Sequence, residues 1–554
     1  MGEGVTDRMA RAGARTTAQM LADAADAWPD RLALRLDDAR LTWADLMRDA
    51  TLYARGLMAM GLGPGSHVGI LMPNAVDYVR LVYAAGMIGA NALTINARFG
   101  EAELAHVIGH CDADALFIGG HALPHLDIRA ALVRVFPALE HWDGGPLDLP
   151  EAPRLKAIVN LADPRETRWP TGETFLAGAA TVAEGDALAA MAAGTPDTPA
   201  LMMYSSGTTA RPKACILTHR MLNTIGAAFA DRFGLTPDDR IMNPLPFFHL
   251  STMLPMAAAR ASGAAQLCSA RFNPGATLDV MEVERATFAY LSFPTLINQV
   301  IAHDTFPARD LSALRYLHAV GPADLMRRYA ATFPHLRYIN AYGLTEATGV
   351  PVWTDPADPP EDAPEVSGRP LPGLAVKAID PESGADLPPG VRGELCIKGW
   401  SVFAGYYKDP AATAATFTPN GWLRTGDAGH VDAAGRVIYS GRIKDMLKIG
   451  GENVAALEIE THLCTHPAIQ VAQVIGVPDD HLGEVAAAFV ELVPGAAVTP
   501  QEVVRHCTGR LARYKVPHYV RIVTEWPMSA TKIQKFRLSR DFTPADRIDP
   551  RTLA

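Results

Sequence analysis

The sequence predicts an α/β protein with a large N-terminal domain and a small C-terminal one. The chain has 554 residues, more than the roughly 250–300 that one hydrophobic core usually serves, so at least two domains are expected. Between residues 68 and 118, short apolar runs alternate with helical segments, which is typical of a parallel sheet covered by helices. From about residue 368 to 440, short strands separated by Pro and Gly predict a small β-barrel subdomain.

Composition and charge exclude several classes of protein. Hydrophobic residues make up 49% of the chain and charged residues 20%, as in ordinary globular proteins. The net charge of −10 and the absence of a basic stripe argue against a nucleic-acid partner. The six cysteines form no CxxC pair, and no run of about 18 uncharged apolar residues occurs. We therefore expect a cytoplasmic protein without a transmembrane segment, a disulfide framework or a zinc site.

The elements of the N-terminal part are predicted from their apolar periodicity. After a frayed start, helices are expected at residues 18–27, 75–89, 101–111 and 219–233, and strands at residues 32–36, 68–72, 92–95 and 115–118. Thr42 and Thr218 precede helical segments and are expected as N-caps, because their hydroxyl groups can accept hydrogen bonds from backbone N–H groups of the first turn. Between residues 124 and 199, the many Pro, Gly and Ala residues favour no particular element.

The remaining elements divide at residue 442, which predicts domains of residues 1–441 and 442–554. Before this point, strands are expected at residues 316–320, 337–340, 376–379, 393–397 and 436–439, with a helix at residues 323–332. The segment after it, about 100 residues, is long enough for a small α/β lid. Its expected elements are a helix at residues 455–464 capped by Asn453, strands at residues 470–477 and 485–492, and a helix at residues 500–511.

A polar loop at residues 204–213 organises the predicted site. It reads Tyr-Ser-Ser-Gly-Thr-Thr-Ala-Arg-Pro-Lys, between two apolar, strand-like runs. Such a loop can offer backbone N–H groups, hydroxyl donors and the Lys213 ammonium to one small, highly charged anion, for which triphosphate is the natural candidate. The common P-loop does not match, because Pro212 and Ala214 stand where it needs Gly and Ser or Thr. The alternative is a solvated turn rich in Ser and Thr.

A second polar group follows the strand predicted at residues 337–340. Ligands of open α/β sheets bind beyond the carboxyl ends of strands, where Tyr342, Thr345 and Glu346 are expected. Tyr342 can stack on a base, Thr345 can bond a phosphate oxygen, and Glu346 can bind a hard cation such as Mg²⁺. Further along, the carboxylate of Asp427 can accept hydrogen bonds from two ribose hydroxyls. An exposed polar turn is the alternative at both places.

The order of these motifs resembles that of the adenylate-forming superfamily, which includes acyl-CoA synthetases, peptide-synthetase adenylation domains and firefly luciferase. The resemblance covers nearly the whole chain, with Tyr-Gly-Leu-Thr-Glu at residues 342–346 and Thr-Gly-Asp at residues 425–427 in the family's order. It implies an acid–thiol ligase of the acyl-CoA synthetase branch that uses ATP, Mg²⁺ and coenzyme A, with a mobile C-terminal lid. A homodimer is left open as the assembly state.

The resemblance also implies a role for each matching residue. The residues that it implies in ATP or AMP binding are Ser205, Ser206, Gly207, Thr208, Thr209, Lys213, Gly321, Tyr342, Asp427, Arg442 and Lys448. Catalysis falls to Thr345, Glu346 and Lys532, metal binding to Glu346, the acyl pocket to His249, the hinge to Lys444, and coenzyme A binding to Gly450, Gly451 and Glu452. Lys532 is chosen over Lys535 by its Ile-Gln-Lys context, and it would neutralise charge between the attacking carboxylate and the α-phosphate. A satisfied structural histidine is the alternative for His249.

Several positions depart from the family pattern, among them the loop Val320-Gly321-Pro322, which differs from the usual Gly-Ala-Pro-like adenine loop. Ala210 and Ala214 stand where the family has glycine, and Thr531 stands where a glycine precedes the catalytic lysine. Alanine replaces glycine at little cost where φ is negative, whereas a positive φ would strain the loop. These departures from glycine motivate one alternative, a non-catalytic homologue that only binds nucleotide or acyl ligand. Another alternative is an adenylating enzyme whose acyl acceptor is a carrier protein.

The expected reaction is activation of a carboxylic acid as its acyl-adenylate, with release of pyrophosphate, followed by acyl transfer to coenzyme A. Two nearly uncharged runs, at residues 254–265 and 291–296, bear on the choice of acid. If they line the acyl pocket, they favour a medium-chain, alicyclic or aromatic acid. If they belong to the core, they carry no information about the substrate.

Overall fold

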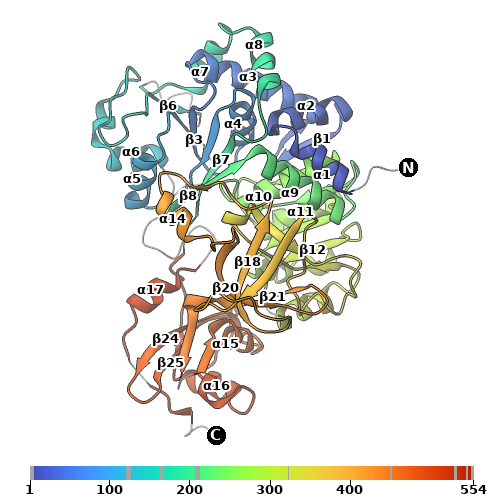
Figure 1. The fold of residues 1–554 in the computed structure, drawn as a ribbon, viewed down its shortest axis with the longest axis vertical. Helices are drawn as coiled ribbons and strands as arrows, with labels where there is room; N and C mark the ends of the chain where they lie inside the picture. The colour runs from blue at the N-terminus through green and yellow to red at the C-terminus, as the bar shows by residue number, and fades with distance from the viewer. Residues whose placement is uncertain are drawn as a thin grey trace.

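The computed structural model describes residues 5–119, 127–161, 168–205, 212–321, 323–449, 452–528, 533–544 and 547–550. It confirms the predicted α/β organisation. Two seven-stranded sheets form the large N-terminal part, smaller antiparallel sheets follow, and the C-terminal elements project from one end of the molecule (Figure 1).

The first seven-stranded sheet contains the two strands that flank the polar loop at residues 204–213. Its strand order is β19-β8-β7-β4-β3-β5-β6, and the pairs among β3 to β7 are parallel, whereas β7–β8 and β8–β19 are antiparallel. The strands are β3 (His67–Leu71), β4 (Asn91–Thr94), β5 (Ala115–Ile118), β6 (Ala157–Asn160), β7 (Pro199–Ser205), β8 (Lys213–Thr218) and β19 (Gly405–Tyr406). Helices α4 (Val76–Met87) and α5 (Glu101–His110) connect the first three, as predicted.

The second seven-stranded sheet has the order β13-β12-β11-β9-β10-β1-β2, and all its pairs are parallel except β1–β2. Its strands are β1 (Leu32–Leu36), β2 (Ala39–Thr42), β9 (Arg240–Met242), β10 (Ala265–Cys268), β11 (Phe288–Ser292), β12 (Tyr316–Ala319) and β13 (Arg337–Ile339). The connecting helices are α10 (Leu250–Ser262), α11 (Pro274–Val283), α12 (Pro294–Ile301) and α13 (Ala323–Thr332). The carboxyl ends of β12 and β13 therefore lead into the predicted nucleotide-binding loops.

Helices α2 (Thr17–Ala27), α3 (Trp43–Ala59) and α9 (His219–Arg232) lie where helical segments were predicted, and the last two have the predicted N-caps. Thr42 accepts a hydrogen bond from Asp45 N, and Thr218 accepts one from Met221 N. The expected frayed start is wrong, because Val5–Gly13 forms helix α1, which packs on α9 and is tied to it by an Arg8–Asp231 ion pair at 2.5 Å. Val5, Met9 and Ala12 recur at helical spacing, and Met9 and Ala12 are buried in the main hydrophobic cluster, so apolar packing as well as the ion pair holds this segment. The unassigned stretch contains α6 (Ile128–Val135), α7 (Gly172–Ala179) and α8 (Glu184–Ala193).

Two antiparallel sheets follow the second large sheet. The first has the order β14-β15-β16 and comprises β14 (Ala341–Leu344), β15 (Gly349–Trp353) and β16 (Arg369–Pro370). The second covers the segment predicted as a β-barrel. Its order is β17-β18-β20-β21, with β17 (Leu374–Ile379), β18 (Gly393–Gly399), β20 (Leu423–Val431) and β21 (Val437–Arg442), and α14 (Pro410–Ala415) precedes β20. A backbone bridge between Gly368 and Val437 joins this sheet to the segment leading into β16.

The C-terminal part has hydrophobic clusters of its own, drawn from residues between 447 and 548. Its sheet consists of β22 (Met446–Ile449), β23 (Glu452–Ala455), β24 (Ile469–Asp479), β25 (Gly483–Leu492) and β26 (Tyr519–Ile522), and its helices are α15 (Ala456–Leu463), α16 (Pro500–Cys507) and α17 (Lys535–Arg540). The predicted cap of α15 is wrong, because Asn453 lies within β23 and Ala455 is the N-cap. The prediction overlooked this strand because it treated the segment as a simple turn.

Within the ranges that the structure describes, no single helix is long and apolar enough to cross a bilayer. In these same ranges, α7 and α8 taken together are long and apolar enough, but they are bent by 87° at their junction.

Candidate active site

A tight turn between β14 and β15 forms the centre of the site. Thr345 and Glu346 lie in its 3₁₀ helix, η3 (Thr345–Ala347). A Cβ on Gly343 would overlap the Gly349 carbonyl oxygen, so this turn requires glycine there. Thr348 adopts a left-handed backbone with φ of 54° and donates its hydroxyl to Ser401 O at 2.6 Å. Because a left-handed conformation is unfavourable for a non-glycine residue, this hydrogen bond helps to fix the turn.

One polar chain leaves this turn toward the antiparallel sheet. Tyr342 donates its hydroxyl to Asp427 Oδ2 at 2.8 Å, and Arg442 Nε lies 2.9 Å from Asp427 Oδ1. Asp427 and Arg442 are direct partners on β20 and β21, so strand register brings them together. Burial and the Asp427 charge raise the pKa of Tyr342, which keeps its hydroxyl a donor. The Tyr439 ring stacks on Tyr342 with centroids 5.5 Å apart.

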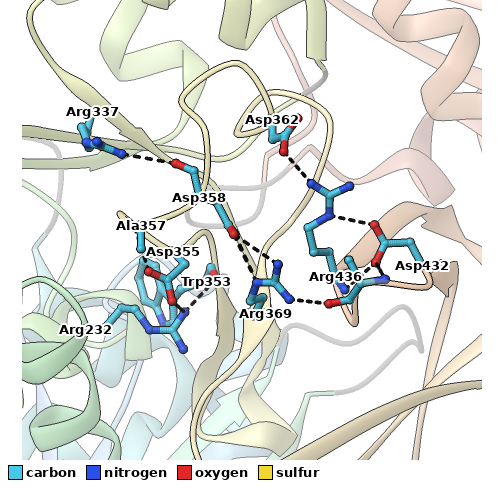
Figure 2. A network of polar contacts seen from close by, with 11 residues as sticks. Arg232, Arg337, Trp353, Asp355, Ala357, Asp358, Asp362, Arg369, Asp432 and Arg436 are labelled. Atoms are coloured by element: carbon cyan, nitrogen blue, oxygen red, sulfur yellow. Dashed lines mark hydrogen bonds and ion pairs between the residues drawn. The ribbon is translucent and has the colours of Figure 1, made fainter.

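A surface network fixes the hairpin between β20 and β21 to the large domain (Figure 2). Arg436 bridges Asp432 on the hairpin and Asp362 on the loop at residues 355–366, each at 2.7 Å. Arg369, at the start of β16, reaches Asp358 of the same loop at 3.2 Å and also donates to Ala434 O of the hairpin. These contacts limit movement of the hairpin that carries Asp427.

A second polar chain leaves the turn toward the loop at residues 204–213. Tyr406 donates its hydroxyl to Glu346 Oε1 at 2.7 Å, and Lys213 Nζ lies 5.0 Å from the centroid of the Tyr406 ring. Tyr406 belongs to β19, which pairs with β8, the strand that Lys213 begins. The first and second polar chains therefore connect the predicted ribose, metal and phosphate residues through the turn at residues 342–348.

Helix α5 contacts both ends of the loop at residues 204–213. His106 Nε2 donates to Pro212 O at 3.2 Å, and His110 Nδ1 lies 2.8 Å from the hydroxyl of Tyr204. Burial, followed by the nearby His106, lowers the pKa of His110, so its ring is neutral at pH 7. The strands that flank the loop are thereby held at a fixed separation.

The predicted acyl residue lies at the start of α10, and the predicted adenine residue lies just after β12. His249 is the N-cap residue of α10, and its ring contacts Phe248 with centroids 4.9 Å apart. The next residue, Leu250, would contact a Cβ on Gly349 at 3.2 Å, so α10 begins against the turn that follows Glu346. Gly321 lies just after β12, with Pro294 and Leu325 around its α-carbon. The structure thus brings His249 close to the turn.

The residues predicted on the lid lie along the start of the C-terminal part. Lys444 is in the 3₁₀ helix η4 (Ile443–Asp445), Lys448 is exposed on β22, and Glu452 is exposed on β23. Strand β23 packs against β21, which ends at Arg442. Seven predicted site residues lie outside the described residues: Ser206, Gly207, Thr208, Thr209, Gly450, Gly451 and Lys532. Ala210 and Thr531 lie outside them as well, and for Ser205 only the backbone, at the end of β7, is described.

Comparison with known families assigns the chain. The family model described as "AMP-binding enzyme" matches residues 21–407, more than half of the chain. A second model, "AMP-binding enzyme C-terminal domain", matches residues 458–532. The chain belongs to the AMP-binding enzyme family. This confirms the resemblance to the adenylate-forming superfamily.

The relatives of this AMP-binding enzyme indicate which reaction it catalyses. "Putative acyl-CoA synthetase YngI" of Bacillus subtilis (strain 168) is 36% identical over 537 residues, which cover 94% of this chain and 96% of that protein. "Feruloyl-CoA synthase" of Amycolatopsis sp is 32% identical over 519 residues, covering 93% and 96%. The crystal structure of the anthranilate CoA ligase AuaEII in complex with anthranoyl-AMP matches with a TM-score of 0.81 and 25% identity, over 95% of this chain and 96% of that one. The chain is therefore an AMP-forming acid–CoA ligase, which uses ATP, coenzyme A and a carboxylic acid.

The donor set around Glu346 is compatible with magnesium. Among the described residues, no group of three or more His, Cys, Asp and Glu side chains could hold a metal ion alone. Mg²⁺ in nucleotide enzymes is commonly held by one or two carboxylates together with substrate phosphates. Glu346 supplies one carboxylate, and Tyr406 contacts only one of its oxygens. A magnesium ion that arrives with ATP fits this arrangement.

The motif analysis overlooked three residues of the site: His106, His110 and Tyr406. The first two lie on a helix that was correctly predicted, but nothing in a helical pattern reveals what its polar face contacts. Tyr406 carried a weak signal, since two tyrosines follow Gly405 just before Lys-Asp-Pro. Adjacent aromatics in a glycine-flanked run are typical of a short strand.

Proposed function

We propose that this AMP-binding enzyme activates a medium-chain, alicyclic or aromatic acid and transfers it to coenzyme A. The observation that carries the proposal is the turn at residues 342–348, from which one polar chain leads to Asp427 and Arg442 and another to Lys213. A nucleotide needs a ribose acceptor, a cation site and a phosphate site at fixed separations, and these chains connect residues of all three kinds.

ATP would bind across the turn. Its phosphates would contact the loop, including Ser205, Ser206, Gly207, Thr208, Thr209 and Lys213. Its ribose would contact Asp427 and Arg442, and its adenine would contact Gly321 and Tyr342. Lys448 would contact the adenylate from the lid. Thr345 would donate to a phosphate oxygen. Glu346 would hold Mg²⁺, which neutralises phosphate charge when it is bound. Most of the catalysis would come from this positioning and charge stabilisation.

The chemistry would proceed in two steps. A carboxylate oxygen of the acid attacks the α-phosphorus of ATP, the bond to the β-phosphate breaks, and pyrophosphate leaves. Lys532 would neutralise the charge that develops between the carboxylate and the α-phosphate. The lid, residues 442–554, would then rotate about Lys444 and present Gly450, Gly451 and Glu452 to coenzyme A. The thiol gives up its proton, its sulfur attacks the acyl carbon, and AMP leaves.

Helix α10 is buried in the main hydrophobic core, so its apolar character does not by itself select the acid. This helix begins beside the turn, and its one charged residue, Arg260, is buried and donates to the Tyr83 hydroxyl at 3.0 Å and to Asn223 Oδ1 at 2.6 Å. Two nitrogens of the guanidinium are therefore hydrogen-bonded to neutral groups of the protein, while Arg260 Nε has no hydrogen-bond partner among the described residues. The names of two compared proteins refer to feruloyl and anthranoyl groups, which are aromatic.

The sequence left two alternative functions open, one with a different acyl acceptor and one without catalysis. They are a carrier protein as acyl acceptor in place of coenzyme A, and a homologue that only binds nucleotide or acyl ligand; similarity to acid–CoA ligases over most of the chain argues against both. One argument for the second alternative is weakened, because Ala214 lies in the extended strand β8, where alanine fits without strain.

Pyrophosphate release in the presence of ATP and a panel of acids tests the proposal. We expect release that depends on the acid, highest with medium-chain, alicyclic or aromatic members and lowest with short polar ones. Thioester formation is then measured with free coenzyme A and with a carrier protein. No acid-dependent release across the whole panel would reject adenylation, and maximal release with a short polar acid would reject the proposed substrate class.

Lys532→Ala should abolish adenylation but spare thioester formation from a supplied acyl-adenylate, because the lysine acts on the first step only. Lys535→Ala is the matched comparison. Lys535 Nζ lies 2.5 Å from Glu460 Oε1 on α15, and this buried carboxylate also accepts a hydrogen bond from Val474 N at 2.7 Å. Its loss should lower the thermal stability of the lid and leave adenylation largely intact. Undiminished adenylation by Lys532→Ala would refute the choice of lysine.

A further inference from the structure

Tyr406 contacts two predicted ligand-binding residues that carry opposite charges. Its hydroxyl donates to Glu346 Oε1 at 2.7 Å, and the Lys213 ammonium lies 5.0 Å from the centroid of its ring. Glu346 and Lys213 are separated by more than 130 positions in the sequence, and Tyr406 joins them. One side chain thus links the carboxylate proposed for magnesium to the cation proposed for phosphate.

The backbone around Tyr406 is fixed on both sides. Ala404 N donates to Ile216 O at 3.1 Å and Tyr407 N donates to Ala214 O at 2.9 Å, so this segment extends the sheet beyond β8. Tyr406 N donates to Thr413 Oγ1 of α14 at 2.9 Å, and α14 packs against β19. The other connection is to the turn, where Phe403 N donates to Glu346 O at 2.9 Å. The aromatic ring therefore has a defined position relative to both charged residues.

The chemistry of a tyrosine suits both contacts. The Tyr406 hydroxyl donates to Glu346 Oε1, because a carboxylate oxygen accepts hydrogen bonds and the hydroxyl supplies the proton. One donated hydrogen bond orients the carboxylate and leaves its second oxygen for a cation. The face of the ring carries partial negative charge and attracts the Lys213 ammonium.

We propose that Tyr406 is a positioning residue that sets the orientation of Glu346 toward magnesium and the location of Lys213 toward phosphate. The inference rests on the proposed function, because it takes these two residues as ligands of Mg²⁺ and ATP. It assigns a separate role to each part of one side chain: the hydroxyl group orients Glu346, and the ring positions Lys213.

Two substitutions separate these contributions. Tyr406→Phe removes the hydroxyl and keeps the ring, whereas Tyr406→Leu removes both. ATP binding is measured by isothermal titration calorimetry without a carboxylic acid, first in EDTA and then at increasing MgCl₂. For Tyr406→Phe, we expect that the Mg²⁺ concentration needed for half of the increase in ATP affinity rises about three- to tenfold, because one hydrogen bond to Glu346 is lost. The affinity for ATP in EDTA should be unchanged. Tyr406→Leu should also weaken binding in EDTA, by about two- to fivefold.

Tyr407→Phe is the matched control. The Tyr407 hydroxyl donates to Asp112 Oδ2 at 2.8 Å, away from Glu346, so its removal should leave both measurements unchanged. Thermal denaturation of each variant establishes that it is folded. If Mg²⁺ strengthens ATP binding by the wild type, and strengthens it at the same concentrations for Tyr406→Phe, then this inference is wrong but the proposed function is unaffected. A wild type whose ATP binding ignores Mg²⁺ overturns the proposed metal role of Glu346 and this inference with it.

Discussion

Replacement of Asp427 by asparagine should weaken ATP binding more than any comparable change on the same hairpin. Asp427 is 3% exposed, and its carboxylate contacts the Tyr342 hydroxyl at 2.8 Å and Arg442 Nε at 2.9 Å. Asparagine keeps the shape and removes the charge that would accept a ribose hydroxyl. A hydrogen bond to a charged group contributes about 1.5–3 kcal/mol, so loss of one predicts a Kd for ATP about ten- to 150-fold higher.

The same substitution should also lower stability by a smaller amount. Arg442 would lose its partner, but its side chain is 35% exposed, so water can solvate the guanidinium. We expect the free energy of unfolding to fall by about 1–2 kcal/mol, less than the ~3–5 kcal/mol typical of breaking a fully buried pair. Urea denaturation of the ligand-free protein measures this loss, and isothermal titration calorimetry measures the Kd.

Asp432→Asn is the control, because Asp432 lies on the same hairpin and also pairs with an arginine. Its partner is Arg436 at 2.7 Å, in the network at the loop of residues 355–366 (Figure 2). This pair is partly exposed, so its loss should change the Kd by less than about threefold. Binding by Asp427→Asn that equals the wild type, or an equal loss in Asp432→Asn, would refute the proposed role of Asp427.

Two further predictions concern stability. Burial lowers the pKa of His219 and of His318 to about 3, so the unfolded chain binds more protons between about pH 6.5 and pH 3. The free energy of unfolding should therefore fall as the pH drops below 6.5, by up to about 1.4 kcal/mol per pH unit for each histidine. His219→Asn keeps an acceptor for Thr17 N–H and removes one of the two titrating groups. The free energy of unfolding, measured by urea denaturation at a series of pH values below 6.5, should therefore fall less steeply with pH than in the wild type. An unchanged dependence on pH would contradict this. Gly226→Ala should destabilise by about 1–3 kcal/mol, because its Cβ would lie 2.6 Å from Ala257 on α10. Gly185→Ala, with open space around it on α8, should be neutral or stabilising, and equal melting temperatures would reject the clash.

The sequence was most informative where local signals and the fold agree. The caps at Thr42 and Thr218 and the strands β3, β4, β5 and β12 were all predicted, because capping and apolar runs depend on a few adjacent residues. The residues Tyr342 and Asp427 were predicted as members of one site, and their contact at 2.8 Å agrees with that prediction. Nothing in the sequence indicated that they contact each other directly.

The features that were not predicted depend on contacts between distant segments. Helix α1 depends on its packing against α9, and the position of Tyr406 depends on pairing between β19 and β8, almost 200 positions apart in the sequence. A two-residue strand has too few residues for periodicity to reveal it. The predicted boundary at residue 442 and the hinge at Lys444 stay predictions, although the separate hydrophobic clusters of the C-terminal part are compatible with them.

The short strand β19 also has a consequence for solubility. In the first large sheet, β8 would be an edge strand without it, presenting unpaired backbone groups to any other extended chain. Residues 404–407 occupy that edge, and β19 itself is only two residues long, which gives an incoming strand little to pair with. Changes that loosen this segment should therefore promote aggregation as well as disturb the site. Selection for a well-formed phosphate site and selection against aggregation would act on the same four residues.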